Sequence, residues 1–116
     1  MEHRLSSRYP ATIAVQLYQH GKAVAWCQAR DVGPDGVFVD TGPLFYRRHT
    51  LLDLEFEVEV NHQFHIRRKY RVPVTVVHNS NDGLGLMMLK AGREAHHAWQ
   101  QVMDKARLQM TTATSA

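Results

Sequence analysis

Alternating apolar and polar residues mark most of this chain as β-strand. The clearest stretch is residues 51–60, where apolar and acidic side chains fall on opposite faces of an extended backbone. The apolar positions are Leu52, Leu54, Phe56, Val58 and Val60, and the acidic positions are Asp53, Glu55, Glu57 and Glu59. This pattern predicts a strand with one face in a core and the other in water.

Less regular patterns predict five more strands, separated by residues that favour turns. They cover residues 12–19, 22–30, 37–39, 64–77 and 84–89. His20-Gly21 is a turn signal between the first two, and Gly42-Pro43 ends the third. Pro73 interrupts a long strand and is easiest to place at a sheet edge or a bulge, because it has no N–H to donate.

The last periodic segment has the spacing of an amphipathic helix. Its apolar residues are Ala95, Ala98, Trp99, Val102, Met103 and Ala106. We expect Trp99 to anchor this helix against the sheet. Six short strands followed by one helix indicate a small antiparallel β-barrel or sandwich capped by the helix, because a closed barrel leaves no exposed strand edge. We therefore expect a flexible arm at 1–10, a folded domain at 11–108 and a disordered tail at 109–116.

The long hairpin pairs an acidic strand with a basic one. A three-residue loop at 61–63 would place Glu59 opposite His65, Glu57 opposite Arg67, Glu55 opposite Lys69 and Asp53 opposite Arg71. The same register turns Arg68 to the apolar face, opposite Phe56. From there Arg68 either lines the mouth of the barrel or extends its charged end outward.

Composition fits one compact domain in a reducing compartment. The chain has 116 residues, 44% of them apolar, and a formal charge of +3 with the eight histidines neutral. This charge suits an anionic ligand without indicating a nucleic-acid-binding protein. Cys27 is the only cysteine, so no internal disulfide can form, and we expect it to be a core residue. No signal peptide or membrane-spanning run is present, so we expect a cytoplasmic protein without membrane insertion.

The sequence offers no motif for metal binding or catalysis. His62 and His65 flank a predicted hairpin loop, and His96 and His97 point to different faces of a helix. No nucleophile elbow, phosphate-binding glycine loop or pair of catalytic carboxylates is evident. We therefore expect neither a metal, nor a cofactor, nor an enzymatic activity.

Two short motifs carry the functional signal. Arg4 and Arg8 stand four residues apart near the start, and the segment Asp31-Val-Gly-Pro-Asp-Gly36 follows the first predicted hairpin. In this order, and with the strand pattern from Arg4 to Arg107, the chain resembles a PilZ domain, whose pattern is Arg-x-x-x-Arg followed by (Asp/Asn)-x-Ser-x-x-Gly. The resemblance implies a six-stranded barrel that binds the second messenger cyclic di-GMP. Gly33 departs from the pattern, which has serine there.

The resemblance assigns the ligand contacts to these two motifs. Arg4 and Arg8 would contact the nucleotide, since a guanidinium donates paired hydrogen bonds to a guanine edge or a phosphate. Asp31 would accept from guanine N1–H and N2–H₂, or else close an Asx turn on its own backbone. Gly36 would supply a positive φ beside the ligand. Gly33 lacks the serine hydroxyl, and losing one neutral hydrogen bond of roughly 0.5–1.5 kcal/mol predicts a fewfold to tenfold weaker complex.

Two other side chains and two other functions complete the predictions. His3 would stack on the ligand or fix the arm, and Arg68 would approach the ligand from the barrel mouth. The favoured function is a cyclic di-GMP receptor that orders its arm and presents a new surface to a protein effector. One alternative is a PilZ-like adaptor with weak or no nucleotide binding, for example in type IV pilus assembly or motility. The other is a single-stranded nucleic-acid binder that uses the basic run at 67–71.

Overall fold

The structure is a computed structural model that describes residues 8–114, with side chains described for residues 8–109. Its strands and helix follow one another in the order that the sequence pattern predicts. They are β1 (Tyr9–Gln19), β2 (Lys22–Val32), β3 (Gly36–Asp40), β4 (Leu51–Asn61), β5 (Ile66–Asn79), β6 (Leu84–Met88) and α1 (Arg93–Thr114). The prediction of six strands and one helix is confirmed.

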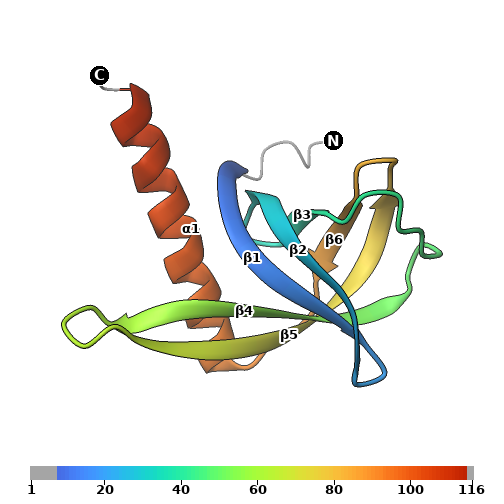
Figure 1. Cartoon of the computed structure of the whole chain (residues 1–116), viewed down its shortest axis with the longest axis horizontal. Helices are drawn as coiled ribbons and strands as arrows, with labels where there is room; N and C mark the ends of the chain where they lie inside the picture. The colour runs from blue at the N-terminus through green and yellow to red at the C-terminus, as the bar shows by residue number, and fades with distance from the viewer. Residues whose placement is uncertain (1–7, 115–116) are drawn as a thin grey trace.

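The six strands close into an antiparallel barrel in the order β1-β2-β3-β6-β5-β4 (Figure 1). Closure follows from the alternation, because each strand contributes every second side chain to one interior. The largest side chains sealed from solvent include Leu17, Leu54, Phe56 and Leu84. β1 and β2 meet in a two-residue turn where His20 and Gly21 have φ of 51° and 80°, as the tight hairpin turn requires.

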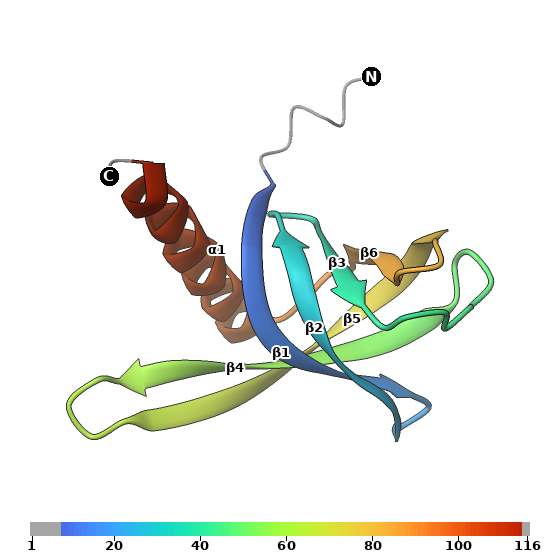
Figure 2. The ribbon, with the colours of Figure 1, turned by 45° about the horizontal axis from the view of Figure 1, so that its top comes forward.

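The helix α1 lies beside β1 and packs on it through the predicted apolar face (Figures 1 and 2). Ala98, Trp99, Val102, Met103 and Ala106 are all buried. The Trp99 ring meets Phe56 edge to face, with centroids 5.1 Å apart. The prediction that Trp99 anchors the helix is therefore confirmed.

Both ends of the folded region differ from the prediction. β1 begins at Tyr9, two residues before the expected start of the domain, because Tyr9 and Pro10 pair with Val32 and Asp31. The helix continues to Thr114, through residues expected to be a disordered tail. Residues 111–114 show no apolar periodicity, but their backbone extends a helix that is already nucleated, and elongation costs far less than nucleation.

The register of the long hairpin is two residues away from the predicted one. Glu59 stands opposite Arg67, Glu57 opposite Lys69 and Glu55 opposite Arg71. The cause is a longer turn over residues 62–65 with a bulge between Glu59 and Asn61. In this turn His65 has a φ of 55°, and the Asn61 Oδ1 accepts the Phe64 N–H at 2.9 Å.

The charge ladder survives this shift in altered form. Glu59 still contacts His65 and Glu57 still contacts Arg67, at 3.1 and 3.4 Å, but Glu55 bonds Arg71 at 3.2 Å instead of Lys69. Arg68 stands opposite Val58, not Phe56, and its side chain is exposed. The prediction that Arg68 faces Phe56 is wrong, and Tyr70 takes that place.

Candidate functional site

The start of β1 lies beside the loop between β2 and β3. Arg8, the described arginine of the first motif, therefore lies next to the second motif at residues 31–36. Tyr9 pairs with Val32, which places Arg8 next to the loop. The Arg8 Nη1 is 3.7 Å from the position that a Cβ on Gly36 would occupy. Two predicted site residues 28 positions apart in the sequence therefore lie in contact distance across the loop.

The loop itself is held by three hydrogen bonds. The Gly33 N–H donates to the Gly36 carbonyl at 2.9 Å, which closes the turn, and the Met88 N–H donates to the Asp35 carbonyl at 2.8 Å. The Trp99 indole N–H donates to the Gly33 carbonyl at 2.8 Å from the helix. The loop is therefore tied to β6 and to α1, and Gly33 is buried within it.

Gly36 is required by a close approach and not by a positive φ, which corrects the prediction. Among the described glycines, positive φ values occur at Gly21 and Gly42. A Cβ on Gly36 would lie 2.9 Å from the Leu86 carbonyl oxygen of the neighbouring strand. Glycine is thus needed here because the close pairing of β3 and β6 leaves no room for a side chain.

A bulge at the end of β2 turns two consecutive side chains outward. The register between β2 and β3 shifts between Ala29 and Asp31, so that Arg30 and Asp31 are both exposed. The Arg30 guanidinium stacks on the Phe38 ring, with Cζ 4.7 Å from the ring centroid. The Asp31 carboxylate makes no hydrogen bond to another described residue, so the alternative of an Asx turn finds no support there.

The remaining predicted residues are placed elsewhere or fall outside the described residues. Arg4 and His3 precede residue 8 and lie outside them. Arg68 lies on the β4–β5 hairpin, where no hydrogen bond or ion pair joins it to another described residue. The structure thus brings together Arg8, Asp31, Gly33 and Gly36, and it does not place Arg68 in contact with them.

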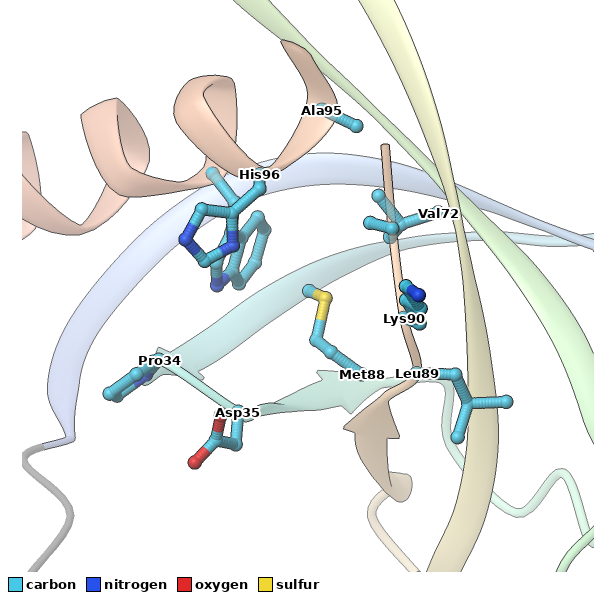
Figure 3. A pocket seen from close by; sticks show the side chains of 10 residues that line it. Pro34, Asp35, Val72, Met88, Leu89, Lys90, Ala95 and His96 are labelled. Carbon is cyan, nitrogen blue, oxygen red and sulfur yellow. The ribbon is translucent and has the colours of Figure 1, made fainter. Parts of the chain in front are cut away.

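A pocket of about 240 Å³ lies on the helix side of the loop (Figure 3). Its polar side chains are Asp35 from the loop, Lys90 from the segment after β6, and His96 from α1. Trp99 forms part of its wall, and Figure 3 shows His96 across the pocket from Pro34 and Asp35. Sequence reasoning missed this pocket, because its walls come from four separate segments that no local pattern connects.

Sequence reasoning also missed the Trp99 hydrogen bond and the Arg30 stack. The indole bond joins residues 66 positions apart in the sequence, and the stack depends on the bulge that sets the register between β2 and β3. The only signal in the sequence was that a buried indole needs an acceptor for its N–H, which does not identify the acceptor.

Cys27 lies in the core, as predicted. It is buried, and burial, together with the negative charge of Asp40, raises the pKa of its thiol to about 11. No group of three or more potential metal-binding side chains converges among residues 8–109. Within the part of the chain that the structure describes, α1 is too polar to cross a membrane.

Two solved structures are similar to this chain over most of its length. The PilZ domain of CeSA from a cellulose-synthesizing bacterium matches with a TM-score of 0.67 and 16% identity, covering 85% of this chain and 97% of that one. The Bacillus subtilis inhibitor of motility, MotI/DgrA, matches with a TM-score of 0.67 and 15% identity. That match covers 96% of this chain and 53% of MotI/DgrA, so this chain spans about half of that protein.

Sequence comparison adds nothing to this result. No family model matches the chain, and no curated protein matches it. The order of the strands, the terminal helix and the two structural similarities show that this chain has the PilZ fold.

Proposed function

We propose that this domain is a non-enzymatic receptor for cyclic di-GMP that acts through a protein effector. The observation that carries the proposal is the contact of Arg8 with the loop at 33–36, next to Asp31, whose carboxylate bonds no other described residue. A cation and an anion are therefore both exposed at the paired ends of β1 and β2. A guanine nucleotide presents both an acceptor edge and a donor edge, together with an anionic phosphate.

The chemistry of the two side chains matches these groups. The Arg8 guanidinium can donate two parallel hydrogen bonds to guanine O6 and N7 or to phosphate oxygens. The Asp31 carboxylate can accept from guanine N1–H and N2–H₂. Arg4 would add a second guanidinium from the arm that precedes Arg8. Closing this arm over the nucleotide changes the surface that an effector meets, and the ordering of the arm is an entropic cost that the arginine contacts must exceed.

Gly33 sets the expected strength of binding. It offers no hydroxyl, but its backbone is fixed by bonds to Gly36 and Trp99, so the loop does not have to be ordered when the nucleotide arrives. We therefore expect reduced but measurable affinity. Gly33→Ser should strengthen binding by a fewfold to tenfold, about the effect of one neutral hydrogen bond.

Calorimetry with purified cyclic di-GMP tests the proposal. We expect saturable binding that Arg8→Ala and Asp31→Ala each weaken by about tenfold to a hundredfold, because each removes hydrogen bonds to a charged group. Arg48→Ala is the matched control, since Arg48 is also an exposed arginine and lies in the loop at the other end of β3. Unchanged binding in both site variants would refute the site.

A PilZ-like adaptor without useful nucleotide affinity is the second candidate, and Gly33 is the observation that favours it. If neither the natural chain nor Gly33→Ser binds cyclic di-GMP while both remain folded, the adaptor function is supported. A titration with single-stranded oligonucleotides covers the third possibility. We expect no tight, salt-sensitive binding, because Arg67 and Arg71 are paired with glutamates.

A further inference from the structure

Over its first half, the strand β5 has one edge that no other described strand pairs with, called here the free edge. β4 pairs with β5 along residues 66–75, whereas β6 pairs only with residues 74–79. Figures 1 and 2 show the resulting two-stranded hairpin extending well past the barrel. A hairpin of two strands alone is only marginally stable in water, so this extension gains from any third strand that joins it.

The hydrogen bonds of β5 show which backbone groups face this edge. Val76 exchanges hydrogen bonds with His49 and Thr50 on the β4 side, whereas the Pro73 carbonyl accepts the Leu89 N–H on the β6 side. The backbone N–H and C=O groups of successive residues point to opposite edges of a strand, and the pairing of residues 67–75 with β4 contains no register shift. The N–H and C=O groups of Arg67, Lys69 and Arg71 therefore point to the open edge, where no other described segment bonds them.

The hairpin carries apolar side chains that nothing in the described structure covers. Phe64 is 68% exposed, Ile66 50% and Val60 43%. Ile66 lies on the same face of β5 as the buried Val72 and Val74, while Phe64 lies in the adjoining turn and Val60 in the bulge of β4. Charged side chains alone would protect an edge against unwanted pairing, but exposed aromatic and aliphatic groups beside the edge work against such protection.

The other face of β5, turned away from Ile66, is basic. Arg67 and Arg71 bond glutamates of β4, whereas Lys69 makes no ion pair with a described residue although it stands opposite Glu57. A strand added to this edge would place alternate side chains beside Arg67, Lys69 and Arg71, and the others beside Ile66, Tyr70 and the aliphatic part of Arg68. The first set fits acidic residues and the second fits apolar ones.

We propose that the free edge of β5 binds an extended segment of a protein partner in which acidic and apolar residues alternate, and that this segment becomes a third strand of the hairpin. β4 has this same composition and already pairs with the other edge of β5. The proposal goes beyond nucleotide binding and does not depend on it, because no residue of the hairpin tip belongs to the site at Arg8 and the 33–36 loop.

A labelled synthetic peptide of alternating valine and glutamate is the probe, and the full chain is used without nucleotide. We expect saturable binding by fluorescence anisotropy and slower hydrogen exchange at the amides of Arg67, Lys69 and Arg71. A peptide of the same sequence, with N-methyl groups on the amides that would face β5, should not bind, because it cannot donate hydrogen bonds to β5. This comparison leaves the protein unaltered, so it remains decisive if a variant misfolds.

Two pairs of variants locate the contact. Lys69→Glu should weaken peptide binding by about tenfold, the scale of an opposed charge pair reversed in sign, while Lys105→Glu on α1 should not. Ile66→Ser should weaken it, while Leu108→Ser, which changes an equally apolar side chain that is 63% exposed, should not.

Four outcomes would overturn the proposal. Equal binding of the methylated peptide would show that no strand is added, and the absence of any peptide binding would contradict the partner class. Cosedimentation with phosphatidylglycerol vesicles but no peptide binding would assign the exposed tip to a lipid surface. Concentration-dependent dimers in sedimentation, abolished by Lys69→Glu and without peptide binding, would assign the edge to a second copy of this chain.

Discussion

At the scale of single residues, Trp99 connects the core to the candidate site. Its ring packs on Phe56 and its N–H bonds the buried Gly33 carbonyl. Trp99→Phe keeps most of the packing but leaves that carbonyl without a donor, which should lower the free energy of unfolding by about 1–3 kcal/mol. Urea denaturation measures this loss. Trp26→Phe is the control, because Trp26 is 71% exposed, and equal stabilities of the two variants would contradict the role of the hydrogen bond.

Gly36 supports a second prediction at this scale. Gly36→Ala introduces a Cβ 2.9 Å from the Leu86 carbonyl oxygen, so β3 and β6 must move apart. Overpacking of this kind should reduce the free energy of unfolding by roughly 1–3 kcal/mol. Thermal denaturation tests this effect. Gly92→Ala is the control without overpacking, since a Cβ there meets nothing within 4 Å; Gly92 caps the start of α1, so we expect only the smaller cost of a poorer cap.

At the scale of elements, the turn of the β4–β5 hairpin predicts a pH response. Hydrogen bonds from His65 and His62 lower the pKa of Glu59 below 4.5, with the His65 bond the larger cause. A carboxylate whose pKa is lower when folded stabilises the fold above its unfolded pKa, and this contribution is lost as the pH falls through the folded pKa. We therefore expect the His65→Gln variant to show a higher Glu59 pKa in an NMR titration. His96→Gln, on α1, should leave it unchanged, and a change there of equal size would contradict the assignment.

The same hairpin shows how far the sequence could predict the fold. Alternation identified all six strands, because burial of one face requires a period of two residues. It failed on the register between Glu57 and Arg67, because that depends on the length of a turn fixed by one positive φ at His65 and one hydrogen bond at Asn61. Arg68 was misplaced for the same reason, since a shift of two residues keeps the face of every side chain but changes its neighbours.

The candidate site was predictable only where it is local. Asp31, Gly33 and Gly36 lie in one loop, and the pairing of β1 with β2 brings Arg8 to it. The contacts that hold this loop come from Met88 and Trp99, which are more than 50 residues away in the sequence. No periodicity or turn signal carries information over such separations, so the pocket and the tie to α1 emerged only from the structure.

At the scale of the whole molecule, the Trp99 hydrogen bond joins the loop at 33–36 to a helix that spans one side of the barrel. A nucleotide bound to Arg8 and Asp31 would lie against the 33–36 loop, whose Gly33 carbonyl accepts the Trp99 N–H. We therefore expect cyclic di-GMP to change the fluorescence of Trp99, because indole emission responds to its hydrogen bond and its surroundings.

The chain makes this measurement clean, since it contains two tryptophans and Trp26 is the exposed one. In a Trp26→Phe background all tryptophan emission comes from Trp99, and it should shift saturably with the same midpoint that calorimetry gives. Adding Arg8→Ala should remove the shift while the unliganded spectrum stays the same. Nucleotide binding by calorimetry with no change in Trp99 emission would mean that the helix is not coupled to the loop, and the effector would then have to recognise the barrel surface or the arm alone.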